Sequence, residues 1–269
     1  YRYTKLITLD CSFTRINELS SSYTRLVNLS CSDTDITFLP KEYSNLQFLN
    51  CSDTKISDIP REYLLLKKLD CGNTNVCVLP SECTDLEFLD CSFTNTCILP
   101  KEYIKLNYLM CSETCISTLP KEYTRLTFLC CSGTCVYELP KTYINLIKLF
   151  CYGTGVSIIP HQYKKLKVLE CWSSNVYNLP STLKKLQVLK CDKTNVIILP
   201  SEYTDLRILS CSNTLVGFLP KGYTQLVELD CSGSLVSKIP ETYKLLKTLN
   251  YENSRIDLVS TKLEKLSMF

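Results

Sequence analysis

The chain is poor in the residues that most enzymes depend on. Its 269 residues include one histidine, one tryptophan, two methionines and seven scattered glycines. The single histidine, His161, leaves no base and orienting group for a nucleophile, and the scattered glycines form no phosphate-binding loop. We therefore expect a chain that is not an enzyme and that needs no cofactor.

Long apolar runs and a strong charge imbalance are also missing. Thirty basic residues face 27 acidic ones, a net charge of +3, which disfavours nucleic acid as a partner. The apolar runs are too short to span a bilayer, and no signal-peptide pattern opens the chain. The sequence therefore predicts neither a membrane segment nor a nucleic-acid-binding protein.

What the sequence does have is an unbroken repeat. It divides into rows of twenty residues from Tyr1 to Phe269 without an insertion or deletion. Numbering positions 1 to 20 within each row, the sixth row carries the recurring residues Leu106, Leu109, Cys111, Thr114, Ile116 and Leu119 at positions 6, 9, 11, 14, 16 and 19. All 11 prolines, Pro40 to Pro240, occupy position 20, and tyrosine is usual at position 3. A fixed period of this length is typical of a solenoid built from stacked repeats.

The consensus row reads L-x-x-L-x-C-S-x-T-x-I-x-x-L-P and resembles the leucine-rich-repeat signature. Cysteine stands for the usual third leucine and threonine for the usual asparagine. This variant is similar to short repeats of giant-virus, bacterial and plant resistance proteins. The resemblance covers the whole chain and implies an α/β-type leucine-rich-repeat solenoid, a curved right-handed stack of about 13 turns with a parallel sheet on its concave face.

The row pattern assigns each position to a face. Alternation over positions 7 to 12 predicts one short strand per row, and positions 3, 6, 9, 11, 16 and 19 point into a continuous core. The position-14 hydroxyl is expected to satisfy backbone groups after the strand. The segment around each proline turns the chain back, so we expect turns and 3₁₀ segments with little regular helix on the convex side. We expect one domain over residues 1–269, in which 261–269 form a partial repeat that caps the C-terminal end through Leu263 and Leu266.

Cysteine is abundant, at 18 residues, and 12 of these occupy position 11. That column is in phase with the core leucines, so we interpret it as reduced thiols packed in the core of a cytoplasmic protein, or one in the host cytoplasm if the chain is viral. Two same-column pairs, Cys77/Cys97 and Cys115/Cys135, are placed to form adventitious disulfides. A zinc site is not expected, because positions 11 and 15 should point in opposite directions.

The sheet face carries the residues that break the monotony of the columns. Position 8 is apolar in many rows, and positions 10 and 12 become apolar in the middle rows. Together they predict one contiguous patch across four strands: Tyr108, Met110, Phe128, Cys130, Phe150, Tyr152 and Trp172. Acidic residues, among them Asp70 and Asp90, flank the patch on one side. Exposed aromatic and methionine side chains are typical of interaction hot spots. The alternative is that bulky side chains merely cover a curved sheet.

A second feature is basic. Five lysines gather at the turns and strand entries of two rows: Lys164, Lys165, Lys167, Lys184 and Lys185. Such a cluster can attract phosphate groups, but clusters of this size usually serve solubility.

These features predict a non-enzymatic module that binds a protein partner on its concave sheet. One alternative is a structural or self-assembling protein, since no cap precedes Tyr1 and an open strand edge favours association. Another is the recognition part of a longer effector, such as a ubiquitin-ligase adaptor.

Overall fold

The protein is described by a computed structural model over residues 3–256. Each described row contributes one strand of three residues. The chain divides into two compact units, Tyr1–Val136 and Tyr137–Phe269, which are described one at a time. The predicted C-terminal cap, with Leu263 and Leu266, lies outside the described residues. The single-domain organisation stays a prediction.

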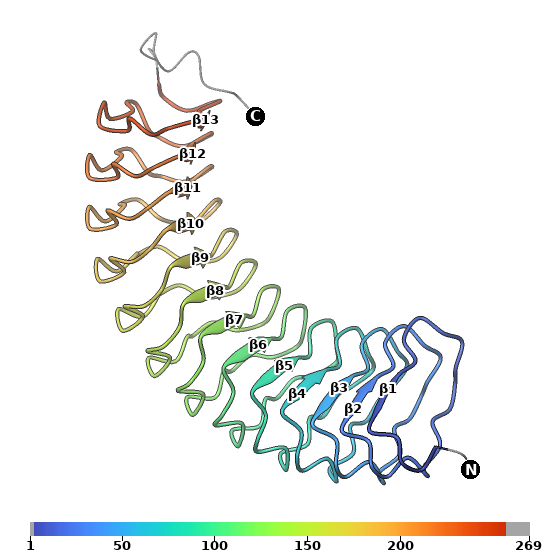
Figure 1. The fold of residues 1–269 in the computed structure, drawn as a ribbon. Coiled ribbons are helices and arrows are strands. Elements are labelled where there is room, and N and C mark those ends of the chain that lie inside the picture. Colours follow the sequence, from blue (N-terminus) through green and yellow to red (C-terminus); the bar gives the residue numbers. More distant parts are fainter. Residues whose placement is uncertain (1–2, 257–269) are drawn as a thin grey trace. The chain divides into compact units, whose positions relative to one another are not determined.

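The first unit contains a parallel sheet in which the strands follow chain order, as Figure 1 shows. The strands are β1 (Thr8–Asp10), β2 (Asn28–Ser30), β3 (Phe48–Asn50), β4 (Lys68–Asp70), β5 (Phe88–Asp90), β6 (Tyr108–Met110) and β7 (Phe128–Cys130). Each residue pairs with the residue twenty positions later, such as Leu89 with Leu109. The repeat therefore fixes the register without any shift.

The second unit is built in the same way. Its strands are β8 (Lys148–Phe150), β9 (Val168–Glu170), β10 (Val188–Lys190), β11 (Ile208–Ser210), β12 (Glu228–Asp230) and β13 (Thr248–Asn250), again parallel and in chain order. The described part of the chain contains no helix. The predicted stack of parallel strands is thus confirmed in each unit.

The strands are shorter than the six positions that the alternation suggested. Main-chain hydrogen bonds between rows nevertheless continue past each strand, as in Cys91 N to Met110 O and Phe93 N to Ser112 O, both 2.9 Å. Only positions 8 to 10 keep strand geometry. The backbone must then turn at position 13, which ends the extended segment.

Position 13 adopts a left-handed conformation in every described row. Asparagine, aspartate and glycine, which tolerate this region best, fill many of these positions, including Asn73 (φ 52°) and Gly133 (φ 64°). Two phenylalanines also occupy it, Phe13 (φ 58°) and Phe93 (φ 57°). The left-handed turn is therefore a property of the row, whatever residue occupies it.

The core forms as predicted. Positions 3, 6, 9, 11, 16 and 19 are buried in the interior rows, as in Tyr103, Leu106, Leu109, Cys111 and Ile116, each fully inaccessible to solvent. Leucines from successive rows meet along the sheet, so that burying one row requires its neighbours. This dependence is the general reason why such repeats are stable only as arrays.

Two side-chain hydrogen bonds recur in the core. The hydroxyl at position 14 donates to the carbonyl at position 11 of the same row, as in Thr114 to Cys111 at 2.7 Å. This confirms the predicted role of the threonine column. The tyrosine at position 3 donates to the proline carbonyl 23 residues earlier, as in Tyr123 to Pro100 at 2.7 Å. The first bond closes a row on itself, and the second ties it to its neighbour.

The return segment consists of two successive turns. In the third row Tyr43 N donates to Pro40 O at 3.3 Å, and Leu46 N donates to Tyr43 O at 3.0 Å. Both bonds span three residues, the spacing of a turn. The predicted turns are therefore present, while no 3₁₀ helix occurs within residues 3–256.

Candidate functional site

In the first unit, aromatic side chains on the exposed face of the sheet form a stack. The rings of Phe88 and Tyr108 lie 4.8 Å apart between centroids at 16°, and those of Tyr108 and Phe128 lie 4.0 Å apart at 7°. Identical positions in a parallel register repeat at about 4.8 Å, which suits face-to-face packing of planar rings. Ring faces are thereby used within the stack, and ring edges are left for solvent or a partner.

The neighbouring column of the same unit is apolar at the same rows. Met110 pairs with Cys130 in the register of β6 and β7. The Cys130 thiol lies 3.0 Å from the Ser112 hydroxyl and is half-buried. Burial raises the pKa of Tyr108, and the charge of Asp90 raises it further, so its hydroxyl stays neutral. This unit thus brings together Tyr108, Met110, Phe128 and Cys130 as predicted.

The second unit has its own stack on the sheet face. Tyr152 and Trp172 lie 4.1 Å apart between ring centroids at 8°. Phe150 pairs with Glu170 in the register of β8 and β9. Glu170 forms an ion pair with Lys190 at 3.0 Å, so the apolar residues border two opposite charges that compensate each other.

All seven predicted patch residues are half-buried. Trp172 was expected to face solvent, but its stacking on Tyr152 covers one ring face. The residues form one cluster in each unit: Tyr108, Met110, Phe128 and Cys130 in the first, Phe150, Tyr152 and Trp172 in the second. We refer to them as the first and second aromatic clusters. That they make one patch stays a prediction.

Two carboxylates sit beside the first aromatic cluster. Asp70 and Asp90 are paired in the register of β4 and β5, as the columns predicted. Burial raises the pKa of Asp70, with further contributions from Asp90 and Asp53, while a hydrogen bond from Gly72 N at 3.1 Å opposes the shift. Keeping Asp70 ionised on this face of the sheet is therefore energetically unfavourable.

The five predicted lysines are all exposed in the second unit, namely Lys164, Lys165, Lys167, Lys184 and Lys185. Lys165 Nζ donates to Asn145 Oδ1 at 2.7 Å. The cluster lies on solvent-facing turns and strand entries, which suits its interpretation as a solubilising surface.

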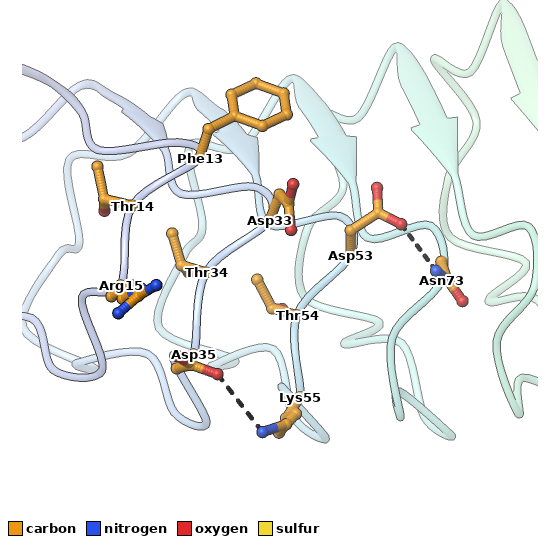
Figure 2. A pocket seen from close by; sticks show the side chains of 10 residues that line it. All are labelled: Phe13, Thr14, Arg15, Asp33, Thr34, Asp35, Asp53, Thr54, Lys55 and Asn73. Carbon is orange, nitrogen blue, oxygen red and sulfur yellow. Dashed lines mark hydrogen bonds and ion pairs between the residues drawn. The ribbon is translucent and has the colours of Figure 1, made fainter.

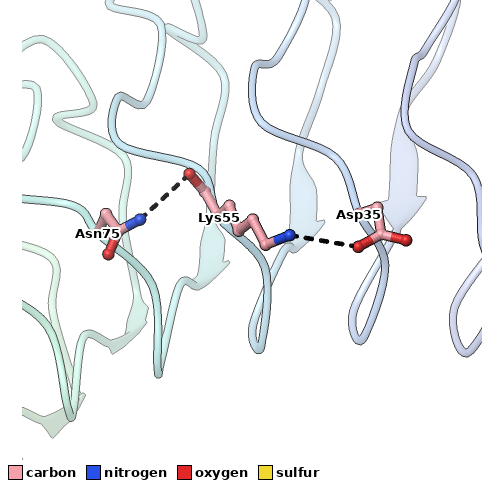
Figure 3. A network of polar contacts seen from close by, with 3 residues as sticks. All are labelled: Asp35, Lys55 and Asn75. Atoms are coloured by element: carbon pink, nitrogen blue, oxygen red, sulfur yellow. Dashed lines mark hydrogen bonds and ion pairs between the residues drawn. The ribbon is translucent and has the colours of Figure 1, made fainter.

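A polar hollow in the first unit was not predicted. Its volume is about 610 Å³, and Figure 2 shows its lining side chains from successive rows at positions 13 to 15. Asp53 accepts from Asn73 Nδ2 at 2.7 Å, and Lys55 pairs with Asp35 at 3.5 Å. Figure 3 extends this contact to Asn75, whose amide donates to the Lys55 carbonyl at 3.4 Å. The hollow is thus lined by one ion pair, Asp35 with Lys55, and by hydrogen-bonded polar side chains from neighbouring rows.

Exposed apolar side chains at position 18 were also missed. They include Val78 and Ile98 in the first unit, 73% and 78% exposed, and Ile198 and Phe218 in the second, 77% and 86% exposed. The signal was a partly apolar column outside the alternating segment. These side chains lie off the sheet face, so they are matched controls for substitutions in the aromatic clusters.

The cysteine column forms a ladder of buried thiols. Several donate to the carbonyl at position 10 of the next row, as in Cys111 Sγ to Cys130 O at 3.5 Å. Burial raises the pKa of Cys31 and of Cys231 to about 12, so these thiols stay protonated. Cys111 is buried whereas Cys115 is exposed, which confirms that the two positions point apart.

The described residues offer little to a metal or a reaction. Within residues 3–256, no group of three or more His, Cys, Asp or Glu side chains is arranged to hold a metal ion. His161 is exposed on a turn, where its carbonyl accepts from Thr182 Oγ1 at 2.7 Å. In the same range there is no helix of a length and hydropathy suited to crossing a membrane.

No protein-family model matches this chain, and no curated protein matches it. Solved structures do. InlJ from Listeria monocytogenes, whose functional domain includes a cysteine ladder, matches with a TM-score of 0.86 at 23% identity, over 98% of this chain and 68% of that one. YopM from Yersinia enterocolitica matches with a TM-score of 0.68 at 22% identity, over 86% of this chain and 52% of that one.

A plant structure is similar as well. The leucine-rich-repeat ectodomain of the membrane receptor kinase GASSHO1/SCHENGEN3 from Arabidopsis thaliana was solved in complex with CASPARIAN STRIP INTEGRITY FACTOR 2. It matches with a TM-score of 0.83 at 20% identity, over 97% of this chain and 38% of that one. At these identities the likeness establishes the fold.

Proposed function

Because the chain folds as a leucine-rich-repeat solenoid, we propose that it is a non-catalytic module that binds a protein partner on the exposed face of its sheet, the face expected to be concave. The observation that carries the proposal is the stacking of Tyr108 on Phe128 and of Tyr152 on Trp172. Tyr152 and Trp172 occupy a column that is otherwise small or polar, and the Tyr108–Phe128 stack borders Met110 and Cys130 in a column that is polar in most other rows.

Stacked rings are a favourable binding surface for a physical reason. A side chain held between neighbours has already lost its rotational freedom, so a partner that contacts it incurs little additional entropy loss. The edges of the rings carry partial positive charge, and partner carbonyls or further aromatic rings pack against them favourably. Large aromatic side chains with this geometry account for much of the affinity in many interfaces.

The charges beside each cluster supply selectivity. Asp70 and Asp90 border the first aromatic cluster, and the Glu170–Lys190 pair borders the second. Complementary charges steer association and exclude wrong partners more than they add affinity. We therefore propose a partner surface that is apolar where it meets the rings and basic where it meets Asp70 and Asp90.

The likeness to the plant ectodomain supports a protein or peptide partner, because that structure is a complex with a protein factor. The protonated, buried thiol ladder supports a reducing compartment, and we extend the proposal to the cytoplasm. Recognition without chemistry agrees with the paired charges of the polar hollow and with the exposed position of His161.

Affinity capture with the wild-type chain, followed by binding measurements on the captured partner, tests the proposal. Phe150→Ser combined with Trp172→Ser removes the second cluster, and Tyr108→Ser combined with Met110→Ser removes the first. Loss of a hot spot should weaken binding by roughly 30-fold or more. Circular dichroism should remain unchanged.

The controls remove equally apolar side chains elsewhere. Ile198→Ser with Phe218→Ser matches the second cluster, and Val78→Ser with Ile98→Ser matches the first, since all four are exposed away from the sheet face. The control variants should keep wild-type affinity. Binding that survives both cluster variants, or that is lost in the controls, contradicts the proposal.

Self-assembly is the alternative proposal. In β1 both outer residues of Thr8–Asp10 are exposed and Leu9 is half-buried, whereas the equivalent leucines of later rows are buried. A second copy pairing with this strand would cover them. Light scattering at several concentrations distinguishes the two proposals, because a monomer at every concentration contradicts assembly.

A further inference from the structure

Four exposed cysteines of the first unit lie outside the buried ladder. They are Cys77, Cys97, Cys115 and Cys135, one in each of four successive rows. Cys77 and Cys97 occupy position 17, and Cys115 and Cys135 occupy position 15. The columns suggest pairing within a position, Cys77 with Cys97 and Cys115 with Cys135.

The structure pairs them differently, because the loops of neighbouring rows are offset. In several rows the amide at position 15 donates to the carbonyl at position 16 of the preceding row, as in Cys135 N to Ile116 O at 3.0 Å and Asn75 N to Ile56 O at 2.9 Å, in rows on either side of Cys115. A residue at position 15 therefore lies beside position 17 of the row before it.

This offset brings two thiols together only once. By this offset Cys115 lies beside Cys97, and the pKa of Cys97 is raised by desolvation first and by the neighbouring Cys115 thiol next. By the same offset, Cys77 faces Asn95 and Cys135 faces Ser117, residues that have no thiol to offer. Cys97 and Cys115 are thus an adjacent dithiol on the surface.

We propose that Cys97 and Cys115 are a modification site at which a hydroperoxide forms a reversible disulfide between the fifth and sixth rows. One thiolate attacks the peroxide O–O bond and becomes a sulfenic acid, and the peroxide leaves as water or an alcohol. The second thiol then attacks the sulfenic sulfur, the S–S bond forms, and a second molecule of water leaves. The two thiols lose two electrons, which the peroxide gains.

Spacing and exposure both favour this reaction. Neighbouring rows are about 4.8 Å apart, within the range of Cα separations that a disulfide spans. Both thiols are exposed, so peroxide reaches them. The ladder thiols nearby do not compete, because Cys91 and Cys111 are fully buried and peroxide does not reach them.

The bond would link the row that carries Tyr108 and Met110 of the first aromatic cluster to the row before it. Cys115 lies in the loop that follows Met110 and β6, and Cys97 lies in the loop that follows Asp90 and β5. A covalent link here holds β5 and β6 together from the loop side. The cross-linked chain should therefore unfold at a higher temperature than the reduced chain, and a thiol reductant should reverse the gain.

Peptide mapping of the full chain tests the site after treatment with hydrogen peroxide and blocking of free thiols. Cleavage by trypsin and a Glu-specific protease after Glu113 separates Cys111 from Cys115, and fragmentation separates Cys91 from Cys97. The expected product is a Cys97–Cys115 linked peptide that dithiothreitol removes. Cys97→Ser and Cys115→Ser should each abolish the link and the thermal shift.

Cys77→Ser and Cys135→Ser are the matched controls, since each removes one of the other two exposed thiols in this group of four. Both should retain the link and the thermal shift. A link within a column, Cys77–Cys97 or Cys115–Cys135, overturns the proposal. So does a product in which the four cysteines are oxidised singly, or in which none reacts.

Discussion

The hydroxyl of Tyr103 donates a hydrogen bond of 2.8 Å to the main-chain carbonyl of Pro80, 23 residues earlier in the chain. Both groups are buried, so neither has water as an alternative partner. Where the row has leucine instead, at Leu183, no side-chain hydroxyl is available for the equivalent carbonyl of Pro160. The bond is therefore a local tie between rows that the fold tolerates losing.

Tyr103→Phe should lower the free energy of unfolding by about 1 kcal/mol, because it removes the shorter of two hydrogen bonds to the Pro80 carbonyl, which keeps the bond from Cys83 N at 3.3 Å. Urea denaturation followed by circular dichroism measures the change. Tyr137→Phe is the control, since Tyr137 is 61% exposed and should have no effect. An equal loss in both variants contradicts the role of the hydrogen bond.

Two neighbouring threonines should respond differently to the loss of a hydroxyl. Thr94 donates to Cys91 O at 2.7 Å, so Thr94→Val should cost about 1–3 kcal/mol. Thr96 occupies a column of isoleucine and valine, and Thr96→Val supplies the side chain that most rows have there. The second variant should stay within about 0.5 kcal/mol of wild type in the same denaturation experiment. If Thr96→Val lowers stability as much as Thr94→Val, the residue type that is usual at position 16 does not predict what the core tolerates at Thr96.

Phe93 combines a left-handed backbone with an exposed ring, at φ 57° and 62% exposure. Asparagine adopts this conformation at lower cost, so Phe93→Asn should stabilise the fold by about 1 kcal/mol. Phe218→Asn removes a ring that is 86% exposed and has no positive φ, and it should change little. Thermal melts of the two variants check the difference, and equal shifts would show that exposure alone matters.

Asp70 should make stability depend on pH with an unusual sign. Burial raises its pKa above the ordinary value for aspartate, so the folded state holds the proton more tightly than the unfolded state. Stability is therefore lost as the pH rises from the unfolded pKa through the folded pKa. Asp70→Asn keeps an acceptor for Gly72 N and should stabilise the chain at neutral pH, with no gain in strong acid.

Asp85→Asn is the counterpart, because a hydrogen bond and the charge of Lys105 lower the pKa of Asp85. Its removal should destabilise at neutral pH and have no effect in strong acid. Denaturant midpoints across the acid range measure both variants. A gain from Asp70→Asn that persists below the ordinary pKa of aspartate contradicts the electrostatic explanation.

The fold was predictable because every core position repeats. A residue such as Leu109 is buried in a context that is the same in row after row, so the pattern alone identifies the inner face. The position-14 hydroxyl was predictable for the same reason. The left-handed turn at position 13 was not, because residues as different as Phe93, Gly133 and Lys193 occupy it.

The candidate site was only partly predictable. The sequence placed Tyr152 and Trp172 on the sheet face, but their parallel stacking depends on rotamers that no column encodes. The contact of Cys97 with Cys115 depends on an offset of two positions between neighbouring loops. Column counting assumes no offset, so it could not single out Cys97 and Cys115 among the four exposed thiols.

The thiol ladder gives this protein an internal set of reporters. Each described row from Cys11 to Cys231 carries one cysteine at the same depth, almost all of them hidden from solvent. A hidden thiol reacts with an alkylating reagent only when its own row opens. Timed alkylation of the unmutated chain, followed by mass spectrometry of the labelled peptides, would report how often each row opens. One experiment would therefore map local opening along the stack.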